Sequence, residues 1–146
     1  MIHARAARRD DADQLADAHI QGWRVGYRGV FPDEFLDSDD FANERIERWR
    51  AWTWTEFAGS SVYVASVAGR VVGFSHLGRV REVAVCDQVG IAEAAKLSLA
   101  DGGEVYGFYL HPDAWGSGAA AELMTRSVVH LTALGYRAAV LWVLRD

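Results

Sequence analysis

The residues with the clearest chemical potential lie in the stretch HPDAWGSGAAAELM, positions 111–124. Gly116 and Gly118 stand where a helix is expected to begin, and three alanines follow at 119–121. The first N–H groups of a helix have no partner inside it and, with the helix dipole, favour an anion. Small residues allow a phosphate to approach these groups closely. The stretch therefore predicts a phosphate or diphosphate site, although close packing alone also produces glycine turns before alanine-rich helices.

A second group of candidate residues is aromatic. His19, Trp23 and Tyr27 recur at four-residue spacing, which places all three on one face of a helix. An aromatic face of this kind suits a cationic amine. Packing of Trp23 and Tyr27 in the protein core explains the same pattern equally well, and the sequence leaves both interpretations open.

The hydrophobic pattern predicts the elements that must position these residues. Strands are expected at 2–6, in a hairpin over 61–78 that turns at Ala68-Gly69, at 104–111 and at 136–144. Helices are expected after a cap at Asp10 or Asp11, and over 41–57, 89–103 and 119–134. This order, with no repeats and no linker, predicts a single α/β domain over residues 1–146 with a mixed sheet.

Composition and charge exclude several classes of function. The net charge of -5 argues against a nucleic-acid-binding surface, which needs a basic face. No apolar run is long enough to span a membrane, and the amino terminus lacks the apolar segment of a secretory signal. The one cysteine, Cys86, and the five histidines show no spacing typical of a nucleophile or a metal site, so no metal is expected. We therefore expect a cytoplasmic protein without nucleic-acid or membrane partners.

The chain resembles the GNAT superfamily of acyl-CoA-dependent N-acyltransferases. The family signature is Gln or Arg, two variable residues, Gly, one variable residue and then Gly or Ala, and WGSGAA at 115–120 supplies Trp115, Gly118 and Ala120 at these positions. LHPDAWGSG is similar to the strand end and turn of many members, and GRVVGFSHLG to the second strand of their hairpin. The resemblance covers essentially the whole chain. It implies a mostly antiparallel, twisted sheet with helices on both faces.

The resemblance also implies roles for particular residues, with acetyl-CoA as co-substrate. Family members bind the diphosphate on the loop and helix start, which implies a cofactor site at Trp115, Gly116, Ser117, Gly118, Ala119 and Ala120. The pantetheine arm pairs like an extra strand with Phe108, Tyr109 and Leu110. The backbone N–H of Leu110 is then a candidate donor to the thioester carbonyl.

The general base is expected to be Glu104, because a glutamate at this strand position serves as base in some family members. An exposed Glu104 that only begins the strand is the alternative. His111 is another candidate base, because histidine titrates near neutrality, but its His-Pro context favours a role in shaping the turn. His19, Trp23 and Tyr27 fall in the region that borders the acceptor pocket in one bacterial subgroup.

The sequence departs from the family pattern at two points. Trp115 replaces Gln or Arg and Ser117 is not basic, which predicts weaker diphosphate binding. The chain ends at VLWVLRD, where family members continue with an Asn, a helix carrying a Tyr and two strands. We therefore expect a domain that is incomplete at its carboxyl terminus. The acid that protonates the leaving thiolate is unassigned, since the sequence does not rank Tyr106, Tyr109 and Tyr136.

The prediction from the sequence is transfer of an acyl group, with acetyl as the expected group, from acyl-CoA to an amine of a small molecule or a protein. The amine attacks directly in a ternary complex. The alternative is a non-catalytic module of the same fold that binds acyl-CoA or a partner chain. The open carboxyl-terminal edge would allow a homodimer, because an unpaired strand edge can accept a second chain.

Overall fold

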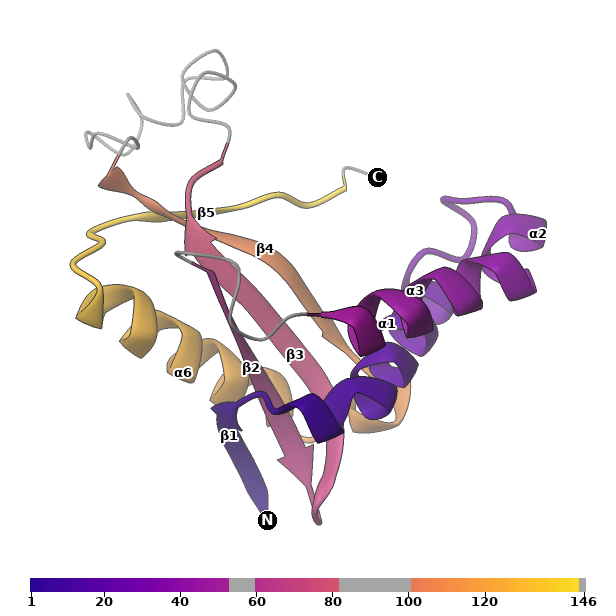
Figure 1. The fold of residues 1–146 in the computed structure, drawn as a ribbon, viewed down its shortest axis with the longest axis horizontal. Coiled ribbons are helices and arrows are strands. Elements are labelled where there is room, and N and C mark those ends of the chain that lie inside the picture. Colours follow the sequence, from indigo (N-terminus) through magenta and orange to yellow (C-terminus); the bar gives the residue numbers. More distant parts are fainter. Residues whose placement is uncertain (53–59, 82–100, 145–146) are drawn as a thin grey trace.

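The computed structural model describes residues 1–52, 60–81 and 101–144, which form one five-stranded sheet with helices on both faces (Figure 1). The strands are β1 (Ile2–Ala6), β2 (Ser60–Val67), β3 (Arg70–Arg79), β4 (Gly103–Leu110) and β5 (Ala139–Leu141), and they lie in the order β1-β2-β3-β4-β5. All neighbours are antiparallel except β4 and β5, which are parallel. The predicted α/β class with a mixed, mostly antiparallel sheet is confirmed.

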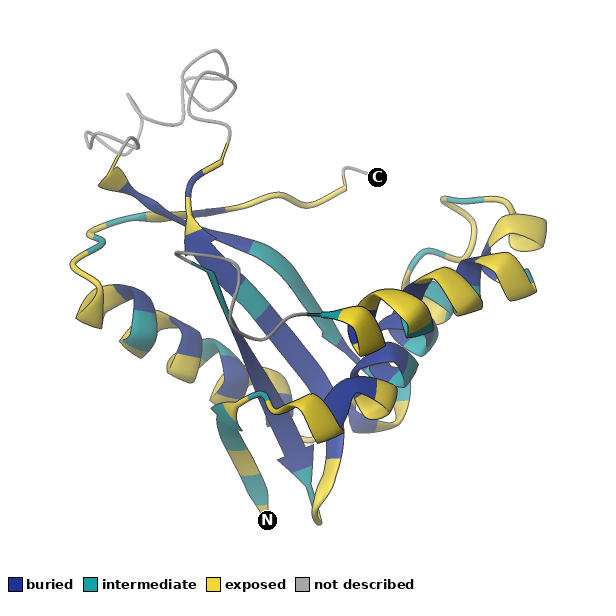
Figure 2. Cartoon of the chain, viewed as in Figure 1, coloured by how far each residue is buried: buried dark blue, intermediate teal, exposed yellow. Residues whose placement is uncertain are grey.

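The expected hairpin is formed by β2 and β3. Ala68 and Gly69 connect them, and both have positive φ values, 50° and 82°. Two consecutive residues of this kind form the turn whose twist matches that of the flanking strands, so Gly69 is well suited to its position. Val62 to Ser66 are buried without interruption, because helices cover both faces of the sheet. In Figure 2 the central strands are accordingly dark blue along most of their length.

Three helices lie on one face of the sheet and on its flank: α1 (Ala12–Gly26), α2 (Asp33–Leu36) and α3 (Asp39–Ala51). Their core contains Leu15, Leu36, Phe41, Trp49 and Phe74, all at most 3% exposed. The opposite face carries α6 (Ala119–Ala133), which packs through Leu123 and Leu131 against Val105, Leu77 and Ala65. The sheet thus separates two apolar cores.

Several predicted boundaries are corrected by the structure. Asp11 lies in a short 3-10 helix, Arg9–Asp11, and its carboxylate binds the Arg5 guanidinium and the Arg8 N–H instead of capping α1. Ser38 caps α3, which ends at Ala51, and residues 53–59 of the predicted 41–57 helix lie outside the described residues. The short helix α2 was not predicted. Cys86 and most of the predicted 89–103 helix also fall outside the described residues.

The last strand is much shorter than the pattern at 136–144 suggested. β5 pairs with β4 only through Gly103, Glu104 and Val105. From Tyr106 onward β4 and the segment that contains β5 diverge, and Figure 1 shows the yellow segment after β5 turning away from β4. The edge of β4 over residues 106–110 is therefore left without a strand partner on this side among the described residues. No helix in the described part of the chain is long and apolar enough to cross a membrane.

Candidate functional site

The loop between β4 and α6 presents a group of free amides. Gly116 and Gly118 have φ values of 76° and 94°, which glycine adopts without strain, and Gly118 is the N-cap of α6. The N–H of Ser117 is donated to Ala114 O, and that of Ala119 to Ser117 Oγ. Within the described residues, the N–H groups of Gly116, Gly118, Ala120 and Ala121 have no protein acceptor. Four donors thus converge on the start of a 15-residue helix, as an anion site requires.

These amides lie on a cavity of about 570 Å³. Its walls are small or apolar: Gly22 and Gly26 of α1, Tyr27, the end of β4 at Phe108, Tyr109 and Leu110, and the loop residues Ala114, Trp115, Gly116, Gly118, Ala120 and Ala121. Of the nine residues predicted to bind cofactor, seven line this cavity. Ser117 and Ala119 do not, because Ser117 holds the turn together through Ala114 O and Ala119 is fully buried.

The open edge of β4 forms one side of this cavity. The backbone N–H of His111 is donated to Val72 O on β3 at 2.7 Å. Successive residues of a strand direct their polar groups to opposite edges, so the N–H groups of Leu110 and Phe108 point away from β3. An extended ligand can therefore pair with this edge as a further strand would.

Trp115 has a defined role that the sequence did not predict. Its indole Nε1–H is donated to Leu110 O at 3.2 Å, while the side chain lines the cavity. The tryptophan that stands in the place of Gln or Arg thus ties the loop to the end of β4. It also occupies one carbonyl of the open edge, which leaves the N–H of Leu110 and both polar groups of Phe108 for a ligand.

A second cavity of about 400 Å³ continues from the first. The two share Gly26, Tyr27, Phe108 and Tyr109. The second cavity lies between β4 and the segment after β5. Its further lining residues are Val30, Tyr106, Gly107, Leu141, Trp142, Val143 and Leu144. The hydroxyls of Tyr27 and Tyr109 lie 3.3 Å apart. Burial, followed by the contact with Tyr27, raises the pKa of Tyr109, so its hydroxyl stays protonated.

Glu104 is not the exposed start of a strand, because it is only 1% exposed. A side chain at neighbouring Gly103 would meet Leu131 and Tyr136 on the α6 side. By alternation, Glu104 projects to the opposite face. The Arg81 guanidinium binds the Glu104 carboxylate through Nε at 2.7 Å and lies 3.8 Å over the ring of Tyr106. Tyr106 in turn lines the second cavity, so Arg81 links Glu104 to one residue of the cavity wall.

The structure does not bring Glu104 and Leu110 together. Six residues of strand separate them, roughly 20 Å at about 3.3 Å per residue. Leu110 lies beside the loop, and Glu104 lies at the end where β4 and β5 still pair. The N–H of Phe108, on the same open edge, is two residues closer to Glu104. His111, the alternative base, accepts the Asp113 N–H through Nδ1, which fits its expected role in the turn.

The three residues of the predicted aromatic face, His19, Trp23 and Tyr27, lie in different surroundings. Tyr27 lines both cavities. His19 is only 8% exposed, stacks on Tyr109, and accepts the Trp49 indole N–H through Nδ1 at 3.2 Å. Trp23 packs against Phe31 and Tyr27. Of the three, Tyr27 alone therefore contacts either cavity, whereas His19 belongs to the core.

Burial of His19 predicts a pH-dependent loss of stability. Desolvation, with smaller effects of Arg45 and Arg48, lowers the pKa of His19 to about 3. In the unfolded chain it titrates near 6.5, so its stabilising effect is complete above that pH and is lost as the pH falls toward about 3. At about pH 5 the expected cost is about 2 kcal/mol in the free energy of unfolding. Urea unfolding at about pH 7 and pH 5 measures it.

A His19→Phe variant should lose about this much of the pH dependence, because the ring remains but no longer titrates. The same replacement at the exposed His3 is the matched control. An unchanged difference between the two pH values in His19→Phe would show that the pKa of His19 is the same in the folded and the unfolded chain.

Sequence reasoning missed the part of the site that α1 and the segment after β5 provide. Gly22 and Gly26 are unusual in a helix, and this was the available signal. A side chain at Gly22 would come within 2.9 Å of Leu110 O, so glycine allows α1 to pack directly on β4. Val30 and residues 141–144 carried no local signal, because only the tertiary fold brings them to the cavity.

Comparison with known proteins gives concordant matches. A model of the acetyltransferase (GNAT) family matches residues 20–146. The chain is 26% identical over 147 residues to the uncharacterised N-acetyltransferase YuaI of Bacillus subtilis strain 168, covering 100% of this chain and 73% of that protein. Among solved structures, PaiA N-acetyltransferase from Thermoplasma acidophilum in complex with coenzyme A has a TM-score of 0.75 at 15% identity, covering 100% of this chain and 81% of that one. Ribosomal-protein-alanine N-acetyltransferase from Brucella melitensis biovar Abortus has a TM-score of 0.58 at 19% identity, covering 99% and 82%.

Proposed function

This chain belongs to the acetyltransferase (GNAT) family, and we propose that it transfers the acetyl group of acetyl-CoA to a primary amine of a small molecule or a protein. Acyl transfer from CoA is the activity of the family. The observation that supports the proposal is the continuity of the site. The free loop amides and the end of β4 line the first cavity, and the second cavity adjoins it at Tyr27, Phe108 and Tyr109.

The residues present fit the co-substrate. The amides of Gly116, Gly118, Ala120 and Ala121 would hold the diphosphate, helped by the positive end of the α6 dipole. No lysine or arginine lines either cavity in the described part of the chain, so these amides are the main attraction for phosphate. The N–H groups of Leu110 and Phe108 would pair with the pantetheine arm, whose thioester supplies the acetyl group.

The reaction is a direct transfer in a ternary complex. The amine nitrogen bonds to the thioester carbonyl carbon, the carbon–sulfur bond breaks, and sulfur leaves with the electron pair. The N–H of Leu110 or Phe108 donates to the carbonyl oxygen as it gains negative charge. Phe108 is the nearer of the two to Glu104. The nitrogen must lose a proton, and Glu104 accepts it through a water molecule, because its carboxylate is buried and lines neither cavity.

The three tyrosines that the sequence did not rank differ in their surroundings. Tyr136 packs against the core on the α6 side, and the Tyr106 hydroxyl is donated to Arg79 O. Tyr109 lines both cavities, and its raised pKa keeps its proton on the oxygen. We therefore assign Tyr109 to donate a hydrogen bond to the departing sulfur, which takes its proton from solvent.

Two measurements test the proposed function. Acetyl-CoA at about 100 times its dissociation constant should stabilise the folded chain by about 2.7 kcal/mol, seen as a rise of roughly 5–10 °C in Tm. Release of free thiol from acetyl-CoA in the presence of a panel of amines should exceed its release in buffer. Tight binding of acetyl-CoA with no amine-dependent thiol release would instead select the non-catalytic module.

A further inference from the structure

The second cavity has no charged side chain among the lining residues that the structure describes. Its walls are Val30, the aromatic rings of Tyr27, Tyr106, Phe108, Tyr109 and Trp142, and the aliphatic side chains of Leu141, Val143 and Leu144. The polar groups of these residues are the tyrosine hydroxyls, the indole N–H of Trp142 and the backbone. Most binding cavities share this pattern, in which apolar walls select the body of a ligand and a few polar groups orient it.

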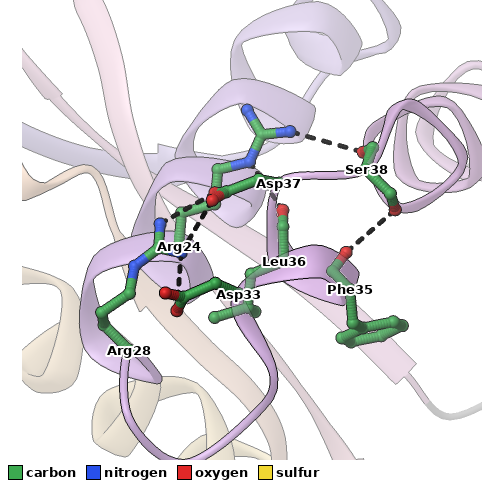
Figure 3. A network of polar contacts seen from close by, with 7 residues as sticks. All are labelled: Arg24, Arg28, Asp33, Phe35, Leu36, Asp37 and Ser38. Carbon is green, nitrogen blue, oxygen red and sulfur yellow. Dashed lines mark hydrogen bonds and ion pairs between the residues drawn. The ribbon is translucent and has the colours of Figure 1, made fainter.

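Three carboxylates near these walls in sequence, Asp33, Asp37 and Glu104, are already engaged, and none of them lines the cavity. Asp33 of α2 and Asp37 just after it both bind Arg28, which follows Tyr27, at distances of 2.9–3.2 Å (Figure 3). Arg24 holds the same segment from α1 through Leu36 O. Glu104 is bound by Arg81 and is 1% exposed. A second positive charge on a ligand would therefore meet no carboxylate among the described residues that line the cavity.

The second cavity is also the direction from which the acceptor must arrive. The pantetheine arm enters from the first cavity, along the edge of β4 at Leu110 and Phe108. Because the attacking nitrogen and the departing sulfur occupy different positions around the carbonyl carbon, the amine approaches from beyond the arm. The space beyond Phe108 and Tyr109 is the second cavity.

We infer that the acceptor is a primary amine with a single ammonium group on an apolar alkyl or aryl body, which the second cavity holds. This inference rests on the proposed function and names its substrate class. An apolar body buries its surface against Val30 and Leu141–Leu144. A second ammonium on the same body would find no carboxylate among the described lining residues, and an unpaired charge held against apolar side chains is unfavourable.

The test compares two amines that differ in one charge, 1-aminopentane and 1,5-diaminopentane, by kcat/KM with acetyl-CoA. The wild type should use the monoamine at least about tenfold better. Val30→Asp, at a position that is 54% exposed and lines the cavity, should shift this ratio substantially toward the diamine, by about tenfold or more. Val129→Asp on α6, at a position that is 51% exposed and lines neither cavity, should leave the ratio close to that of the wild type.

The outcomes distinguish failure of the inferred substrate class from failure of the proposed acetyl transfer. If the wild type uses the diamine as well as or better than the monoamine, the substrate class is wrong while acetyl transfer stands. If the monoamine is preferred but Val30→Asp does not move the ratio, the second cavity does not hold the acceptor. Faster transfer of hexanoyl than of acetyl to 1-aminopentane would assign the cavity to the acyl chain. If no amine releases thiol from bound acetyl-CoA, the proposed function itself fails.

Discussion

Replacing Glu104 by glutamine is expected to lower kcat by a factor of about 10² to 10⁴, the range that general-base catalysis contributes. Glutamine has nearly the same shape as glutamate and can still accept the hydrogen bond from Arg81, so β4 should keep its position. It cannot accept the proton that the amine must lose. The binding of acetyl-CoA should be unchanged, since the loop amides lie at the other end of β4. Steady-state kinetics together with a thermal shift in acetyl-CoA measure both quantities.

The matched control is Glu47→Gln, the same replacement at an exposed position of α3. It should leave kcat and the thermal shift as in wild type. A Glu104→Gln enzyme that retains more than about a tenth of the wild-type kcat would show that another group accepts the proton. Loss of acetyl-CoA binding in the same variant would mean instead that the Glu104–Arg81 pair holds β4 in the position that binds acetyl-CoA. The two measurements therefore distinguish a general base from a positioning residue.

The glycine loop before α6, with its free amides, was predictable from sequence because its signal is local. Gly116, Gly118 and the alanines after them are neighbours in the chain, and the start of a helix has the same unpaired amides in every protein. The hairpin was predictable for the same reason, since Ala68-Gly69 specifies the turn between two β-branched segments. In both cases the residues that specify the local conformation are neighbours in the sequence.

The second cavity could not be predicted, because its walls come from distant parts of the chain. Val30 and Leu144 line one cavity only because α1 packs on β4 and because β5 separates from β4 after three residues. His19 shows that local spacing does not determine which residues of a helix face stay accessible. Its spacing with Tyr27 correctly places both on one side of α1, but packing of α3 through Trp49 buries His19 and leaves Tyr27 at the cavity. Sequence spacing gives the face of a helix, and the neighbouring helix decides which part of that face stays open.

Trp115 is a third case. The sequence shows that this residue is neither Gln nor Arg, but it does not show what the indole contacts. The absence of Gln or Arg at this position suggested a weaker diphosphate site. The structure gives the indole N–H a partner in Leu110 O, so the loop is held by a neutral contact instead of a charged one. In the proposed site, binding of the diphosphate depends on backbone amides, so a charge introduced beside them should change the affinity strongly.

Ala120→Asp is expected to weaken acetyl-CoA binding at least about 100-fold without weakening the fold. Ala120 is exposed, lies in the first turn of α6 and lines the first cavity. A carboxylate in the first turn of a helix interacts favourably with the dipole, so stability without ligand should be unchanged or slightly higher. The same carboxylate would occupy the space intended for the diphosphate. One pair of like charges about 4 Å apart costs up to about 4 kcal/mol near a protein surface, enough for this loss of affinity.

Isothermal titration with acetyl-CoA at two salt concentrations measures the effect, and the repulsion should weaken as the salt concentration rises. Asn43→Asp is the control, because it adds the same charge at an exposed position near the start of α3, away from both cavities. It should bind acetyl-CoA as wild type does. An Ala120→Asp protein that folds normally and binds acetyl-CoA with unchanged affinity would show that the diphosphate lies elsewhere. The start of α6 would then be a packing turn, the alternative that its small residues left open from the beginning.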